Sequence, residues 1–317
     1  MRIGLVLGAG GLVGQAFHLG VLTALHEQGF DARDADVLVG SSAGSLVAAG
    51  LAGGLSAPDL AAELLGEPLS DEGRSLRSTR QTSVARLPME AVEASRRPLA
   101  PQALLSAARR PWAVRPAAVV SSLLPAGRID TEPIARGVRH LHGDHWPDRD
   151  LRLCVVRARD ARRVVLGTPG APPVDVGTAV AASCAIPAYF SPVRFAGETW
   201  VDGGMHSPSN ADVLVQDRLD LVVVVSPMSV ARPVRRRVGR PPVDLGVRMA
   251  IRQVLALEVR RLRRAGSRVV VLQPGRADLE VMGVNPMRMT HLDEVVRRAE
   301  ASTTTRLAVQ PGLLARQ

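Results

Sequence analysis

The first forty residues contain the feature that most constrains the fold: an apolar strand, a glycine-rich loop, a helix and a second apolar strand in direct succession. Residues 2–7 are typical of a buried strand, residues 8–14 of a loop, residues 15–28 of a helix, and residues 36–39 of the next strand. A strand–helix–strand unit of this length makes its two strands parallel. The sequence therefore predicts an α/β fold built on a parallel sheet.

The second strand leads into Gly40-Ser41-Ser42-Ala43-Gly44, after which the sequence becomes typical of a helix. Gly-x-Ser-x-Gly between a strand and a helix is the nucleophile-elbow pattern, in which side chains at the flanking positions would clash. The elbow places the serine hydroxyl at the amino end of a helix, where developing negative charge is favoured. Ser42 is therefore the candidate nucleophile.

The glycine loop invites comparison with a dinucleotide-binding loop, but two positions exclude that interpretation. Gly-x-Gly-x-x-Gly requires glycine where this chain has Val13, and the second strand ends in Gly40 instead of an acidic residue. A better use of Gly10 and Gly11 is to turn bare backbone N–H groups toward an oxyanion beside Ser42.

The remaining chain continues the α/β pattern, and we expect one domain over residues 1–317. Proline and arginine interrupt residues 66–128, which we interpret as an insertion that covers the site like a cap. Further strands are expected at residues 151–157, 163–166, 200–202, 219–225 and 269–272, and further helices at 101–108, 131–141, 176–184, around 251–262 and at 292–307.

The charge of the chain bears on its partners. The formal net charge is +10 and no lysine occurs, so the basic residues besides histidine are all arginine. The aromatic residues are too few and scattered to stack nucleic-acid bases, so we expect no nucleic-acid partner. An anionic membrane surface fits the arginine clusters at residues 232–240 and 260–264 better.

The sequence also bears on location and on the two cysteines. It has no run of eighteen apolar residues and no pattern of a signal peptide, so we expect a cytoplasmic or membrane-peripheral protein. Cys154 and Cys184 lie in apolar stretches, which favours buried free thiols over a disulfide.

A histidine-rich stretch offers a different chemistry. His140, His142, Asp144 and His145 form a His-x-His-x-Asp-His pattern that di-metal hydrolases use. In such sites the ligands follow a strand, whereas here they follow a helix-like segment, so a polar surface loop is the favoured interpretation. We expect no metal and no cofactor, and keep the di-metal hydrolase as an alternative.

A serine nucleophile needs a base, and the chain offers two solutions. The order serine, acid, histidine of α/β-hydrolases would require His291, which begins the last helix. A carboxylate acting alone would be Asp202, at the end of a short strand and followed by Gly203 and Gly204. Burial would raise the pKa of that carboxylate toward the range of a useful base.

In their order and settings these features resemble the patatin-like phospholipase family. The resemblance rests on the glycine loop 9–14, the segment 18–22, the elbow 40–44, the run 182–190 and Asp202-Gly-Gly, and it spans about residues 3–215. It implies a three-layer αβα sandwich and a Ser42–Asp202 dyad, with the amides of Gly10, Gly11 and Ala43 as oxyanion hole. His18 matches a family position at which packing is expected.

The resemblance implies a serine esterase or lipid acyl hydrolase that acts on acyl esters, including phospholipids. Two positions depart from the usual glycine loop: Ala9 replaces a glycine and Val13 replaces a basic residue, which removes a charge near the site. The alternatives are the di-metal hydrolase and a protein that keeps the fold and binds lipid surfaces without catalysis.

Overall fold

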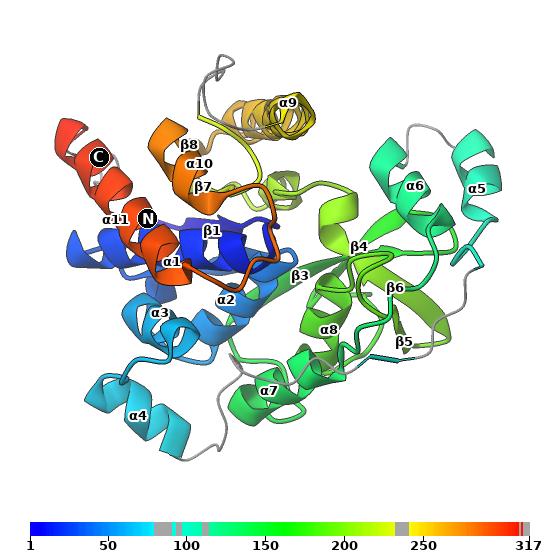
Figure 1. Cartoon of the computed structure of the whole chain (residues 1–317), viewed down its shortest axis with the longest axis horizontal. Coiled ribbons are helices and arrows are strands. Elements are labelled where there is room, and N and C mark those ends of the chain that lie inside the picture. Colours follow the sequence, from blue (N-terminus) through cyan, green and yellow to red (C-terminus); the bar gives the residue numbers. More distant parts are fainter. Residues whose placement is uncertain (79–90, 93–96, 110–113, 232–240, 311, 313–317) are drawn as a thin grey trace.

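The computed structural model of the chain describes residues 1–78, 91–92, 97–109, 114–231, 241–310 and 312 (Figure 1). The strands are β1 Ile3–Leu7, β2 Val37–Gly40, β3 Asp150–Arg157, β4 Arg162–Leu166, β5 Val193–Phe195, β6 Glu198–Asp202, β7 Leu221–Val225 and β8 Arg268–Leu272. The α-helices are α1 Gly11–Glu27, α2 Ala43–Ala52, α3 Ala57–Leu65, α4 Asp71–Ser78, α5 Ala103–Arg109, α6 Pro116–Leu123, α7 Glu132–His142, α8 Val176–Ser183, α9 Pro242–Arg264, α10 Arg276–Met282 and α11 Leu292–Val309. Short 3-10 helices include η1 Ala32–Asp34, η4 Gly203–Met205 and η5 Ala211–Leu214.

One mixed sheet forms the centre of the molecule. Its eight strands follow the order β5-β6-β3-β2-β1-β7-β8, with β4 paired to β3. The pairs β3–β2, β2–β1, β1–β7 and β7–β8 are parallel, whereas β4, β5 and β6 join by antiparallel pairing. The mostly parallel sheet expected from the sequence is confirmed.

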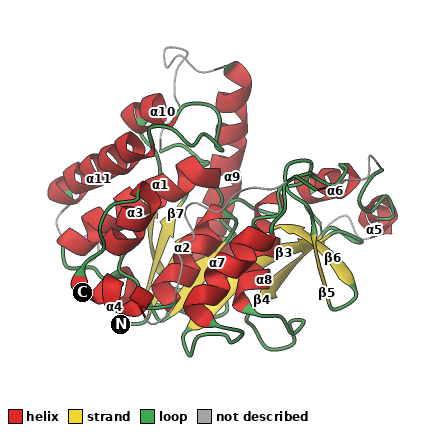
Figure 2. Ribbon diagram, turned by 60° about the horizontal axis from the view of Figure 1, so that its bottom comes forward, coloured by secondary structure: helices red, strands yellow, loops and turns green. Residues whose placement is uncertain are grey.

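Helices cover both faces of this sheet (Figure 2). Leu5 and Leu7 pack on the face covered by α1, α2, α8 and α11, while Val6 packs on the face that holds α9. Because successive side chains of a strand point to opposite faces, a strand buried on both sides has to be apolar throughout. β7 meets this condition with Leu221-Val-Val-Val-Val225, buried at every position. The three-layer αβα sandwich is confirmed.

Helix α1 differs from the sequence-based expectation. The sequence placed its start near Gln15, but it begins at Gly11, so half of the glycine loop is helical. The amide of Gly14 already donates to Gly10 O at 2.9 Å, which closes the first turn. Glycine has a low helix propensity, and the close packing around this turn outweighs that cost.

The described parts of residues 66–128 lie at two separate places. Helix α4 follows α3, and the Asp59 carboxylate accepts from the Ser70 amide at 2.7 Å to hold that connection. Helices α5 and α6 lie far from α4, near β3 and β6 (Figure 1). There Ala103 and Ala118 pack against Val156 of β3 and Val201 of β6. The described helices therefore do not form one compact cap, and residues 79–90, 93–96 and 110–113, which the cap prediction also covers, lie outside the described residues.

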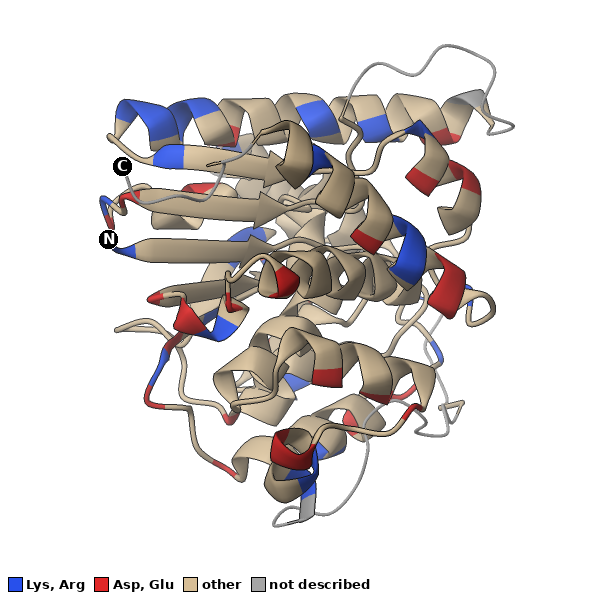
Figure 3. Ribbon diagram, turned by 90° about the vertical axis from the view of Figure 1, so that its left-hand side faces the viewer, with Lys and Arg blue, Asp and Glu red and all other residues tan. Residues whose placement is uncertain are grey.

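The structure describes only one of the two arginine clusters. Residues 232–240 lie outside the described residues. The second cluster ends α9, and β8 begins at Arg268 directly afterwards, so the cluster lies at the edge where the parallel strands start (Figure 3). Ser42 follows the carboxyl end of β2, at the other edge of the sheet. In the described part of the chain no helix is both long and apolar enough to cross a membrane.

Candidate active site

The turn between β2 and α2 has the geometry of a nucleophile elbow. Ser42 adopts φ 53° and ψ −125°, a conformation that side chains avoid and that a non-glycine residue holds only under constraint. A Cβ on Gly44 would lie 2.0 Å from Leu7 O, and one on Gly40 would lie 2.6 Å from the Cα of Ser45. The two flanking glycines are therefore required by close backbone contacts, as the sequence predicted.

Helix α8 fixes the backbone of Ser42. The Ser42 amide donates to Ser183 Oγ at 3.0 Å, and Ser183 Oγ donates to Cys154 O of β3 at 2.7 Å. On the other side, Ser45 Oγ donates to Ser42 O at 2.6 Å. These bonds tie the strained turn to β3 and to the first turn of α2.

Asp202 is brought to Ser42 from β6. A Cβ on Gly203 would lie 2.1 Å from Cys154 O, so glycine is required for the strand end to pass this close to β3. The Ser42 hydroxyl lies close enough to the Asp202 carboxylate to favour its charged form, and the Gly204 amide donates to Asp202 Oδ1 at 2.7 Å. Burial raises the pKa of Asp202 to about 7, and these two groups only partly oppose that rise.

The glycine loop supplies backbone donors beside the serine. Gly10 caps α1 with an extended φ of −179°, and Gly11 has a φ of +62° that favours glycine. No acceptor for the amides of Gly10, Gly11 or Ala43 occurs among the described residues. The first amides of a helix lack intrahelical partners and attract negative charge. The structure thus places three unpaired donors at the starts of two helices.

His18 contacts the glycine loop at the carbonyl of Gly8. Its side chain is fully buried, and Nε2 lies 2.7 Å from Gly8 O. Burial lowers the pKa of His18 to about 4, so the ring is neutral at physiological pH and donates from Nε2 to the carbonyl. The buried position fits the packing role expected for His18. Its hydrogen bond to Gly8 O also connects α1 to the glycine loop.

The connection between α10 and α11 touches the same loop, which the sequence did not suggest. Pro286 O accepts from the Val13 amide at 3.0 Å, and a Cβ on Gly11 would lie 2.5 Å from that oxygen. The Sδ of Met287 would lie 2.9 Å from the same Cβ. Gly11 therefore permits the close approach of a segment more than 270 positions away.

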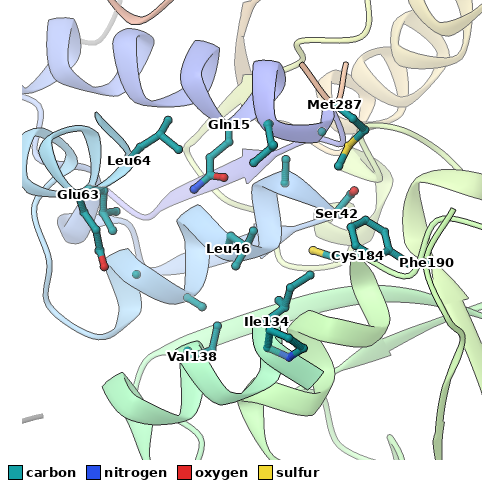
Figure 4. Close-up of a pocket in the computed structure, with 18 of the residues that line it drawn as sticks. Gln15, Ser42, Leu46, Glu63, Leu64, Ile134, Val138, Cys184, Phe190 and Met287 are labelled. Carbon is teal, nitrogen blue, oxygen red and sulfur yellow. The ribbon is translucent and has the colours of Figure 1, made fainter. Parts of the chain in front are cut away.

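A predominantly apolar cavity of about 270 Å³ opens from Ser42 (Figure 4). Its walls come from α1, α2, α3 and α7, from the Cys184–Phe190 segment and from the methionines Met287 and Met289. Cys184 is free and buried, as is Cys154, which confirms the expected thiols. Burial and the nearby Asp202 charge raise the pKa of Cys184 to about 12, so this thiol stays protonated.

The other candidate histidines have different surroundings. His291 precedes α11, is exposed, and lies 3.0 Å from Glu294 Oε1. His206 follows η4, and burial together with the Arg163 charge lowers its pKa to about 4.

The histidine-rich stretch does not converge. His142 is the last residue of α7, and its Nε2 lies 2.8 Å from Ala49 O. Within the described ranges no three histidine, cysteine, aspartate or glutamate side chains are grouped so as to hold a metal ion.

The sequence also did not predict a buried polar network that reaches the turn of Ser41. Glu258 of α9 is fully buried and accepts from Ser207 Oγ at 2.6 Å and Ser209 Oγ at 2.5 Å. Burial, together with the Asp212 charge, raises the pKa of Glu258. Both serines precede Asn210, whose side-chain amide donates to the hydroxyl of Ser41. A lone glutamate in an arginine-rich amphipathic helix gives no sequence signal for such a contact.

One family model and two solved structures are similar to this chain. The family model described as Patatin-like phospholipase matches residues 5–215. The solved structure of VipD from Legionella pneumophila is 14% identical with a TM-score of 0.44, and the match covers 97% of this chain and 67% of that one. The structure of the type III effector protein ExoU is 19% identical with a TM-score of 0.40, and the match covers 100% of this chain and 54% of that one. This chain thus spans about half the length of the latter. No curated protein matches the sequence.

Proposed function

The chain belongs to the patatin-like phospholipase family, and we propose that it is a serine lipid acyl hydrolase with Ser42 as nucleophile and Asp202 as general base. The observation that carries the proposal is the proximity of the Ser42 hydroxyl to the buried Asp202 carboxylate. No third residue is needed in this arrangement, because the acceptor of the serine proton is adjacent to it.

Hydrolysis would proceed in two halves. Ser42 Oγ attacks the ester carbonyl carbon while Asp202 takes the hydroxyl proton. The tetrahedral intermediate collapses, Asp202 gives the proton to the departing alcohol, and the acyl group stays on Ser42. Water then attacks the acyl carbonyl as Asp202 accepts its proton. The carboxylic acid leaves and Ser42 regains its proton.

The oxyanion of each tetrahedral intermediate would face the amides of Gly10, Gly11 and Ala43. Their lack of acceptors among the described residues supports this role, since preorganised donors cost no reorganisation during the reaction. The positive φ of Ser42 directs its side chain away from the helix that follows, which leaves the hydroxyl accessible to substrate.

The substrate class follows from the cavity. Its apolar walls suit the acyl chain of a lipid ester, and we propose phospholipids among the substrates. Val13, where the family usually has a basic residue, is buried, so this position offers no charge to an anionic head group. A cytoplasmic location and peripheral contact with an anionic membrane remain predictions from the sequence.

The test is covalent labelling. A fluorophosphonate probe should react with the purified protein, and peptide mass spectrometry should locate the adduct on Ser42 and not on the adjacent Ser41. The Ser42→Ala variant should lose both labelling and ester hydrolysis while its circular dichroism is unchanged. A folded wild-type protein that neither reacts with the probe nor cleaves any ester would support the non-catalytic lipid-binding alternative. Activity that depends on added metal would support the di-metal alternative.

A further inference from the structure

The cavity beside Ser42 is a channel that follows the axis of α2. Ser42, Leu46 and Gly50 line it at intervals of four residues, which places them along one face of the helix. On the opposite wall Ile134 and Val138 of α7 repeat the same spacing, and Figure 4 shows Leu46, Ile134 and Val138 on the same side of Ser42.

Small residues keep the channel open. Ala49 and Gly137 line it where α2 and α7 face each other, and neither residue has a side chain large enough to fill it. The floor is therefore apolar, and its shape suits an extended hydrocarbon chain.

The far end of the channel has a different character. A Cβ on Gly50 would lie 2.5 Å from Leu60 Cδ2, so α3 crosses the channel at this point. Glu63, one turn further along α3, lines the channel together with Arg77 of α4. Figure 4 shows Glu63 at the end of the cavity away from Ser42.

Glu63 and Arg77 form a largely buried ion pair. Arg77 Nη2 donates to both oxygens of the Glu63 carboxylate, and the side chains are only 12% and 9% exposed for Arg77 and Glu63. Arg77 Nε and Nη1 are also buried and have no partner among the described residues. A hydrocarbon terminus that reached further would have to part this ion pair and could offer neither partner a hydrogen bond, which is unfavourable.

The length of the channel follows from helix geometry. Eight residues separate Ser42 from Gly50, which corresponds to roughly 12 Å along the axis of α2. An extended chain covers that distance in about ten carbon–carbon bonds. The ion pair begins at the next turn.

We propose that the Glu63–Arg77 pair closes the acyl channel and selects esters of medium-chain acyl groups, of about eight to twelve carbons. The inference rests on the proposed hydrolase activity and deepens it. Each methylene buried in the channel should raise kcat/KM about fourfold up to this limit. Chains beyond the limit meet the ion pair and lose that gain.

The experiment measures kcat/KM on p-nitrophenyl esters from C4 to C16 at one fixed detergent concentration. For the wild type we expect a rise to a maximum between C8 and C12 and at least a tenfold fall by C16. In Glu63→Ala/Arg77→Ala the ratio of C16 to C10 activity should rise at least tenfold. Both partners are removed together because Glu63→Ala alone would leave the buried Arg77 charge without the carboxylate that it contacts.

Two further variants complete the design. Asp71→Ala/Arg74→Ala removes an exposed ion pair from the same helix α4 and should leave the chain-length profile unchanged. Leu46→Phe adds volume to the middle of the channel and should move the maximum to shorter chains, which tests the channel even if the double variant does not fold.

The outcomes separate the two proposals. A wild type that cleaves short esters through Ser42 but shows no maximum, or a maximum that neither Leu46→Phe nor the folded double variant moves, overturns the chain-length inference and leaves the hydrolase intact. A wild type without activity on any ester and without probe labelling overturns both.

Discussion

The side-chain amide of Asn210 donates a hydrogen bond of 2.8 Å to the hydroxyl of Ser41, the residue next to the proposed nucleophile. The same amide lies 3.1 Å from Gly203 O, the residue next to the proposed base. Asn210 is fully buried and adopts the left-handed conformation, φ 52°, that asparagine tolerates. One side chain therefore connects the turn of Ser42 with the turn of Asp202.

Replacing Asn210 should separate these turns. We expect Asn210→Ala to lower kcat about 10- to 100-fold with a smaller change in KM, because small displacements of reacting groups are costly while the channel is untouched. Steady-state kinetics together with a melting curve would measure this. A variant that melts normally and keeps the wild-type kcat would exclude a positioning role.

Asp202→Asn should be nearly inactive and yet more stable. The amide keeps the shape but cannot accept the serine proton, so a loss of about 10²–10⁴-fold or more is expected. At pH 8 the wild type must hold a buried carboxylate whose pKa is raised from 3.8 to about 7, which costs roughly 4 kcal/mol.

The sign of this stability effect depends on pH. Between about pH 4 and 7 the folded carboxyl of Asp202 keeps a proton that the unfolded one has lost, so the wild type loses stability as pH rises through this window. The advantage of Asp202→Asn should therefore be small at pH 4 and full at pH 8. Urea unfolding at both pH values would check this, and an advantage that shrinks with rising pH would contradict it.

The pH dependence of catalysis should report the same carboxyl. Because the base must be ionised, kcat/KM should rise with pH and level off above an apparent pKa of about 7. His206, whose pKa burial lowers to about 4, is neutral throughout this range and should not contribute. His206→Ala should keep both the profile and most of the rate. A loss as deep as that of Asp202→Asn would favour a histidine base.

Membrane contact through the end of α9 should be separable from catalysis. Arg260 and Arg264 are exposed and lie at the sheet edge opposite Ser42. Arg260→Ala/Arg264→Ala should weaken salt-sensitive co-sedimentation with anionic vesicles, by about 1 kcal/mol per arginine near the surface. Hydrolysis of a short-chain ester should stay at the wild-type rate. Equal sedimentation of both proteins at low salt would remove this cluster from the binding surface.

The parts of the fold and site that depend on residues close in sequence could be predicted from local patterns. Apolar runs predicted the strands, and the elbow glycines predicted a turn whose flanking positions admit no side chain. Two glycines after an acid leave room for a close backbone approach, but the pattern did not identify β3 as the segment that Gly203 contacts.

Contacts between distant segments were not predictable in this way. The closure of the loop by Pro286, the support of Ser42 by Ser183 and the Glu63–Arg77 pair each depend on how separate helices pack. Serine, proline and an ion pair are common on any surface, so neither composition nor spacing distinguishes these residues before the fold is known.

The position of β1 in the middle of the sheet has a consequence for the limits of the family match, which ends at residue 215. β7 pairs with all five residues of β1, from Ile3 to Leu7, and β7 begins only at Leu221. A protein truncated at residue 215 would leave a central apolar strand with an open edge, ready to pair with other chains. We expect such a fragment to aggregate on expression. We therefore propose that the boundary of the family model is not a boundary of folding, and that the last third of the chain folds together with the catalytic elements.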